Sequence, residues 1–193
     1  GYDIELKNYP CINELSLALL LLTCLYGYLN HFTGQSFAVL ALCTSVLHFI
    51  RLTQWKGYKA WRVPIIWILH LGYFWLVLGL FLEGLYALNG VVSFQAALHT
   101  FTIGSIGTMI LGMMTRVSLG HTGRPIVSLR SMVVAYVILQ VSVLSRLFGE
   151  TVLTDYYLES IQFSGYLWAV TFALFTARYA YILLTPRPDG KSA

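Results

Sequence analysis

The stretch from Pro64 to Tyr86 reads PIIWILHLGYFWLVLGLFLEGLY, and it decides the fold class. Apart from His70 and Glu83, every residue in it is apolar, aromatic or glycine. A helix needs about 20 apolar residues to cross a hydrocarbon core of about 30 Å. Backbone groups in lipid must bond internally, so a run of this length there must be helical. The stretch therefore predicts a transmembrane helix.

The rest of the chain has the same character. Of its 193 residues, 58% are hydrophobic and only 10% are charged, whereas a soluble domain carries about 25% charged residues. We therefore expect an all-α polytopic bundle of about six transmembrane helices, forming one domain over residues 1–193. Short connections make neighbouring helices antiparallel. The expected helices are Asn13–Leu29, Gln35–Leu52, Pro64–Tyr86, Phe94–Arg116, Ser131–Phe148 and Ile161–Leu184.

Basic residues gather on one side of this expected topology. Arg146 stands alone on the other side, near three acidic residues. Because Lys and Arg near helix ends collect in the cytoplasm, both termini are expected to be cytoplasmic. The isoelectric point near 9.0 then reflects membrane-surface charge, and we infer no nucleic-acid partner from it. The eleven residues on the basic side are Lys7, Arg51, Lys56, Lys59, Arg62, Arg116, Arg124, Arg130, Arg178, Arg187 and Lys191.

Ionisable residues inside a membrane are costly and are candidates for function. His48 and His70 are expected at similar depth on sequential helices, near the cytoplasmic side, and could converge on one metal or haem iron. His70 is the deeper of the two and shares its helix face with Phe74, so we expect it to be the first iron ligand and His48 the second. The alternative is that each histidine bonds a neighbouring helix.

Arginines lie at the same membrane face as these histidines. Arg51, Arg116 and Arg124 could pair with haem propionates through forked hydrogen bonds, or face lipid phosphates instead. His121 is expected just past the end of the fourth helix, in a loop with Arg124. We include it among the candidate ligands.

The outer half of the bundle offers a second group. Glu83 and His99 are expected at comparable depth on adjacent helices, where they could pair with each other or hold a metal or a proton. On the fourth expected helix, and separate from this outer group, Met113 with Met109 and Met114 could supply soft thioether ligands to copper(I), although such methionines more often only pack.

The three cysteines, Cys11, Cys24 and Cys43, are an odd number, which argues against a disulfide framework. Inside apolar runs, Cys24 and Cys43 are expected to act as small hydrophobes, with a soft-metal pair as the alternative.

Small residues recur on two of the expected helices. Gly104, Thr108 and Gly112 repeat every four residues, and Gly72 and Gly79 share a face with Glu83. Such stripes let helices approach closely. The sequence has no Walker motif, GxGxxG or CxxC, so nothing supports nucleotide or hydrolase chemistry.

Several motifs together resemble the NnrS family. They are residues 98–100 and 112–125, which include GMMTRVSLGHTGRP, with 48–52, 55–57, 64–73, 177–179 and 186–190. The resemblance covers most of the chain from Gln35 onward and is weak before it. It implies a multi-pass protein of the bacterial cytoplasmic membrane that contains haem b and copper and is linked to nitric oxide and nitrosative stress in denitrifying and other bacteria.

Family members are about twice this length. The resemblance therefore implies that this chain is the C-terminal half, with the N-terminal half and nitric oxide as further partners beside the lipid bilayer. His48, His70, His99 and His121 match family histidines, but the resemblance does not assign ligands among them. It leaves open an enzyme, a sensor or a transporter, and the contrasting hypothesis is a non-enzymatic scaffold or small-molecule transporter with structural histidines.

Overall fold

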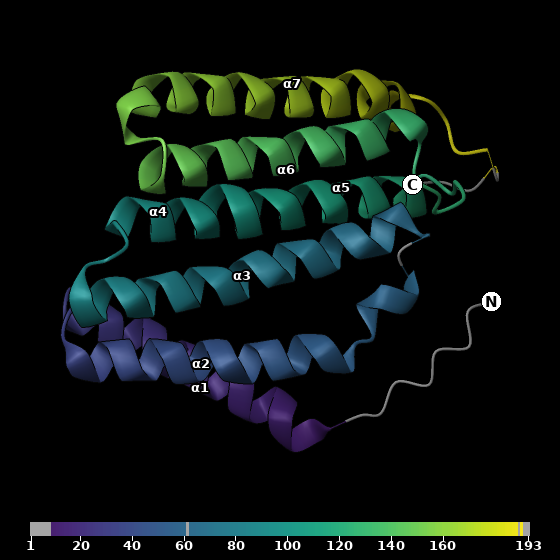
Figure 1. The fold of residues 1–193 in the computed structure, drawn as a ribbon. Coiled ribbons are helices and arrows are strands. Elements are labelled where there is room, and N and C mark those ends of the chain that lie inside the picture. Colours follow the sequence, from purple (N-terminus) through teal and green to yellow (C-terminus); the bar gives the residue numbers. More distant parts are fainter. Residues whose placement is uncertain (1–8, 61, 189, 191–193) are drawn as a thin grey trace.

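The computed structural model describes residues 9–60, 62–188 and 190, and within them all regular structure is helical (Figure 1). Six spans are long and apolar enough to cross a membrane, which confirms the predicted fold class. They are α1 (Pro10–Leu29), α2 (Gln35–Gln54), α3 (Pro64–Asn89), the continuous run of α4 (Phe94–His99), the π-helix η2 (Thr100–Gly107) and α5 (Thr108–His121), then α6 (Arg130–Thr151) and α7 (Tyr157–Leu184). Two short 3₁₀ turns complete the set, η1 (Gly57–Ala60) and η3 (Thr154–Tyr156).

The helices lie side by side in chain order (Figure 1). Each packs on the next, and α5 also contacts α7. In α1 and α7 only 17% of the most apolar window is buried, against 44% in α3 and in the α4–α5 span. The outer helices are therefore the edges of the row, while α3 and α4–α5 form its centre.

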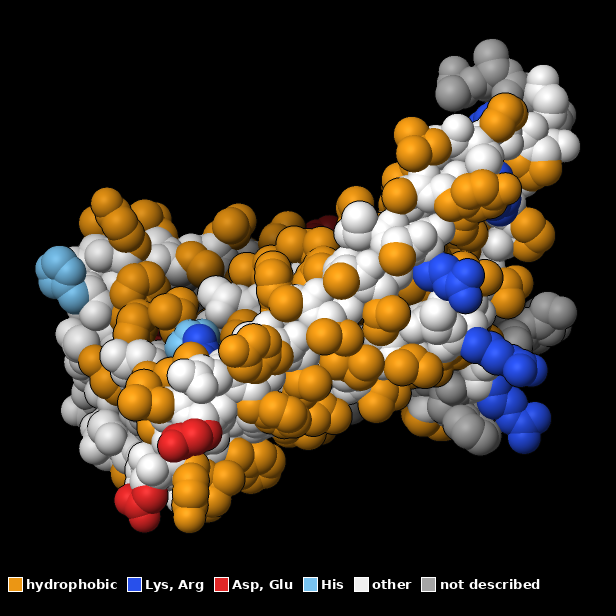
Figure 2. All heavy atoms as spheres, turned by 90° about the horizontal axis from the view of Figure 1, so that it is seen from above, with side chains coloured by type: hydrophobic (Ala, Val, Ile, Leu, Met, Phe, Trp, Pro, Cys, Tyr) orange, Lys and Arg blue, Asp and Glu red, His pale blue; other side chains and the backbone are white. Residues whose placement is uncertain are grey.

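Charge separates along the helix axes. Blue Lys and Arg side chains gather at one end of the visible face in Figure 2, red Asp and Glu side chains lie at the other, and an orange apolar belt lies between them. The first helix begins and the last helix ends at the same end of the bundle (Figure 1). This is the arrangement from which the sequence predicts cytoplasmic termini, and that orientation stays a prediction. We call this end of the bundle the basic end and the opposite end the acidic end.

The predicted small-residue stripes lie where α3 meets the α4–α5 span. A Cβ on Gly104 would lie 3.0 Å from the ring of Trp75, and one on Gly72 would lie 2.8 Å from Met109. Both glycines are therefore needed for close approach, as predicted from their spacing. This contact fixes the rotation of α5 relative to α3, and so decides which α5 side chains lie beside His70.

The π-helical turns of η2 were not predicted. They pack against α3 beside the buried Trp75, whose indole nitrogen donates to Gln140 of α6 at 2.6 Å. The Gln140 amide in turn donates to Thr108 at 3.1 Å. Widened turns of this kind occur often at functional sites. Here they accommodate a bulky indole between three helices.

Candidate functional site

His70 lies two turns into α3, and its ring is oriented by its own helix. The ring Nδ1 is 3.0 Å from the carbonyl of Ile66, so Nδ1 carries the proton and donates it there. Nε2 is then the nitrogen with the lone pair. It is buried and has no hydrogen-bond partner among the described residues. A neutral imidazole with a fixed tautomer and a free lone pair is the form that binds metal.

The connection between α2 and α3 closes over this ring. Gly57 lies so near that a Cβ on it would be 2.8 Å from the ring Cγ and 2.9 Å from Nε2. Trp55 meets the same ring edge-on, with centroids 5.9 Å apart. The sequence Trp55-Lys56-Gly57 therefore places an indole and a bare backbone against His70, where any side chain at residue 57 would collide.

A pocket of about 660 Å³ opens beside His70, and we call it the His70 pocket. Three candidate residues from two helices line this pocket together: His70 of α3, and Met113 and Arg116 of α5. Met109, packed on Gly72, lines it too. The full lining is Trp55, Ala60, Ile66, Leu69, His70, Met109, Met113 and Arg116. His70 also borders a second, mainly apolar pocket of about 510 Å³ with Tyr58, Trp67 and Phe74.

His48 is placed differently. Its Nδ1 is 2.6 Å from the Tyr73 hydroxyl, and its Nε2 is 3.0 Å from the carbonyl of Ser16. Both ring nitrogens are thus bonded to the protein. Between His48 and His70 lie the rings of Tyr73 and Trp55, whose centroids are 4.5 Å apart. The expected convergence of the two histidines on one site is therefore not seen, because these two rings separate them.

The three candidate arginines separate in the same way. Arg51 donates to Asn13 at 3.0 Å and to the Tyr73 hydroxyl at 3.3 Å, while Arg124 donates to Ile182 at 3.2 Å and to Thr185 at 2.7 Å. These two guanidinium groups tie helices together. Arg116 lines the His70 pocket and is the one placed to meet an anionic group there.

His121 is exposed at the last residue of α5, not in the loop after it as expected. The helix runs past Arg116 for more than a turn. The backbone carbonyl of His121 accepts a hydrogen bond from Arg187 at 2.9 Å. His121 is not among the residues that line the His70 pocket.

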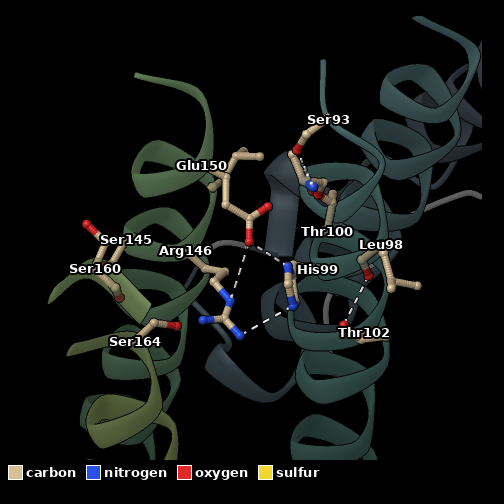
Figure 3. Close-up of polar contacts among 12 residues, drawn as sticks. Ser93, Leu98, His99, Thr100, Thr102, Ser145, Arg146, Glu150, Ser160 and Ser164 are labelled. Atoms are coloured by element: carbon tan, nitrogen blue, oxygen red, sulfur yellow. Dashed lines mark hydrogen bonds and ion pairs between the residues drawn. The ribbon is translucent and has the colours of Figure 1, made fainter. Parts of the chain in front are cut away.

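His99 does not pair with Glu83, so that expectation is wrong. The ring of His99 turns toward α6, where its Nδ1 lies 2.8 Å from Glu150 and its Nε2 lies 3.3 Å from Arg146 (Figure 3). Glu83 is buried on α3 without a hydrogen bond among the described residues. Adjacent depth on neighbouring helices was the basis of the prediction, and it does not fix which way a ring turns about the helix axis.

We call His99, Arg146 and Glu150 the His99 cluster. The Glu150 side chain is only 3% exposed, and its carboxylate lies 3.7 Å from the Arg146 Nε one helical turn away. One signal for the cluster was present in the sequence, since Arg146 and Glu150 have the i, i+4 spacing of helical ion pairs. Arg146 is also the lone basic residue predicted on the outer side. Arg146 donates to His99 Nε2, whereas His99 Nδ1 and the Glu150 carboxylate lie at ion-pair distance without a hydrogen bond among the described residues.

Metal ligation of the carboxylate and imidazole kind is not prearranged. Within residues 9–60 and 62–188, no three His, Cys, Asp or Glu side chains gather closely enough to hold a metal ion. The three cysteines are free and exposed, so Cys24 and Cys43 form no closed pair. The polar and sulfur-containing side chains that line the His70 pocket are instead one histidine, two methionines and one arginine, together with Trp55.

Comparison with known proteins gives one match. No curated protein and no solved structure is similar to this chain. A protein-family model described as "NnrS protein" matches residues 3–187. The match covers nearly the whole chain. It includes α1, where the sequence motifs resembled the family only weakly. The chain is therefore a multi-pass membrane protein that belongs to the NnrS family.

Proposed function

We propose that this protein binds haem b in the His70 pocket, with His70 Nε2 as a ligand to the iron, and that it acts through this cofactor in the nitric oxide response that family membership supports. One observation carries the proposal. A buried imidazole nitrogen with a fixed lone pair and no hydrogen-bond partner in the described part of the chain lies beside a pocket of about 660 Å³. Pockets for cofactors commonly measure about 300–1,000 Å³ and are mostly apolar.

The donors at the pocket suit the group. Neutral imidazole is a common ligand of both iron and copper, and the Ile66 carbonyl holds the His70 ring in the orientation that a ligand needs. Arg116 offers forked donors for a propionate. Met109 and Met113 supply thioethers, which could hold copper(I) in the same pocket.

The chain's own residues would orient and shield the cofactor. Gly57 and Trp55 contact one side of the His70 ring, and apolar side chains from α3 and α5 line most of the rest of the pocket. When bound, haem iron supplies a coordination site that nitric oxide can occupy. His48, both of whose ring nitrogens are bonded to the protein, is left out of the proposed ligand set.

The test is the colour and metal content of the full-length protein purified in detergent. We expect a Soret band that shifts on reduction and on addition of nitric oxide, with iron found by elemental analysis. His70→Ala should lose the band. His31→Asn is the matched control, because His31 lies outside every helix at φ 56°, which Asn tolerates well. A folded parent protein without haem and without metal would overturn the proposal.

A scaffold or transporter role is the second candidate, and one observation favours it. His48 and His99 both have their two ring nitrogens engaged by other residues of the chain, as structural histidines do. On this hypothesis His70→Ala changes stability only, and the purified protein is colourless.

A further inference from the structure

A pocket of about 370 Å³ lies beside the His99 cluster, and we call it the Arg146 pocket. It forms where η2 and α7 both pack on α6. Three of its lining residues are exposed, so in a chain that spans a membrane the pocket opens toward the lipid. These exposed residues are Thr102, Gly165 and Trp168, and the others are Ile103, Arg146 and Ser164.

Two neighbours orient the Arg146 guanidinium and leave one of its nitrogens unused. NH2 donates to His99 Nε2 at 3.3 Å, and Nε lies 3.7 Å from the Glu150 carboxylate. NH1 is buried and has no hydrogen-bond partner among the described residues. In Figure 3 this third nitrogen is directed away from His99, on the side where Ser164 lies. Since Arg146 and Ser164 both line the pocket, NH1 is directed toward it.

A buried cationic donor of this kind needs an acceptor, because leaving a charged donor unpaired costs more than leaving a neutral one. The hydroxyls of the lining do not fill this role. Ser164 donates to the carbonyl of Ser142 at 2.9 Å, and Thr102 donates to that of Leu98 at 3.0 Å. An oxyanion would accept a charge-assisted hydrogen bond from NH1, and guanidinium groups match phosphate oxygens in shape and charge.

We propose that Arg146 binds a phosphate-type oxyanion in this pocket, and that the headgroup of a phospholipid in the leaflet at the acidic end supplies it. Arg146 lies about 7–8 Å along the helix from Thr151, the last residue of α6. Its side chain reaches Glu150, one turn nearer that end. Long basic side chains near helix ends extend to the interface, where lipid phosphates lie. Trp168 suits the same depth, since tryptophan is enriched at membrane interfaces.

The wall that η2 contributes is a second indication of a binding site. Thr102 and Ile103 belong to its π-helical turns, and widened turns of this kind occur often at functional sites. The Arg146 pocket shares no lining residue with the His70 pocket. The lipid site therefore does not rest on the proposed cofactor.

The first test is native mass spectrometry of the full-length protein, released from detergent micelles that contain phosphatidylethanolamine and phosphatidylglycerol. We expect Gly165→Leu to retain one phospholipid fewer than the wild type, because the leucine side chain fills the pocket. Nothing lies within 4 Å of the Cβ position at Gly165, so this change leaves the His99 cluster intact. Ala177→Leu is the matched control, at an exposed position of α7 outside the pocket, and should retain the lipid.

The second variant tests the guanidinium itself. Arg146→Gln combined with Glu150→Gln removes both charges together, so that neither is left buried alone. Because a hydrogen bond to a charged group is lost, the folded double variant should bind the lipid about tenfold or more weakly. Wild-type lipid binding in both Gly165→Leu and the double variant would overturn the proposal.

A calorimetric titration of the delipidated protein with inorganic phosphate distinguishes the two sources of the oxyanion. Retained phospholipid without phosphate binding assigns the site to a lipid headgroup. Phosphate binding that Gly165→Leu abolishes, without retained lipid, would overturn the lipid source and keep the oxyanion. A wild-type protein that holds neither would overturn both.

Discussion

The two groups of buried polar side chains in this bundle differ in what surrounds their histidine. In the His99 cluster, near the acidic end, a cation, an anion and an imidazole lie within 2.8–3.7 Å of one another across α4 and α6, although several of their polar atoms have no hydrogen bond among the described residues. Around His70, near the basic end, one ring nitrogen is bonded and the other is left with a lone pair beside a pocket. The unpartnered nitrogen beside a pocket is the observation from which we proposed a bound cofactor at His70.

The largest effect is expected from Glu150→Ala. It leaves Arg146 and His99 without their anion in a cluster whose carboxylate is almost completely buried. Breaking a buried ion pair on one side costs about 3–5 kcal/mol, so the free energy of unfolding in mixed detergent micelles should fall by that amount. Cofactor content per folded molecule should not change.

Replacing the whole cluster is the control for that prediction. Combining His99→Phe, Arg146→Met and Glu150→Met should restore most of the lost stability, because apolar residues of similar volume often replace a buried ion pair without cost. A loss below about 1 kcal/mol in Glu150→Ala would instead mark the pair as screened like a surface salt bridge.

The second effect is expected from Gly57→Ala, which acts on the His70 pocket. The new Cβ would collide with the His70 ring. Overpacking costs about 1–3 kcal/mol, and the displaced ring should also lose the Soret band. Gly165→Ala on α7 is the control, because nothing lies within 4 Å of its Cβ position. Equal haem content in the Gly57 and Gly165 variants would show that His70 is not oriented by this contact.

The sequence was sufficient for the helices, but it paired His70 with His48 and did not predict which residues share the His70 pocket. Long apolar runs fix the spans, and the glycines at 72 and 104 show where α3 meets the α4–α5 span. That contact sets the rotation of α5, and Met113 and Arg116, which the sequence offered as separate candidates, line the pocket beside His70. The free lone pair at His70 follows from its i−4 carbonyl, which is local to one helix.

Rotation about the helix axis explains what the sequence could not give. A helix that is apolar all round presents no face that marks its neighbour. His99 was therefore assigned to Glu83 by depth alone, whereas its ring turns to α6 and finds Glu150. His48 was likewise assigned to His70 by depth, whereas its ring is hydrogen-bonded to Tyr73. The π-helix depends on how Trp75 packs between helices, which no local pattern specifies.

The smallest effect is expected from Arg51→Lys. Lysine keeps the charge but cannot bond Asn13 and the Tyr73 hydroxyl together, as the forked guanidinium does. Losing one such hydrogen bond should lower the free energy of unfolding by about 0.5–1.5 kcal/mol. Arg178→Lys, at an exposed site with one bond to Ser131, should change it less. Thermal unfolding of the two variants side by side gives the comparison.

Haem content in two histidine variants tests the central contrast most directly. His70→Ala and His99→Gln are purified from the full-length protein, matched for folded protein by size-exclusion chromatography, and assayed by pyridine haemochrome. We expect that His70→Ala loses its haem, because the lone pair beside the pocket is removed, and that His99→Gln keeps it, because His99 lies outside the pocket with Glu150 and Arg146 beside its two nitrogens. Full haem content in His70→Ala together with loss in His99→Gln would contradict it.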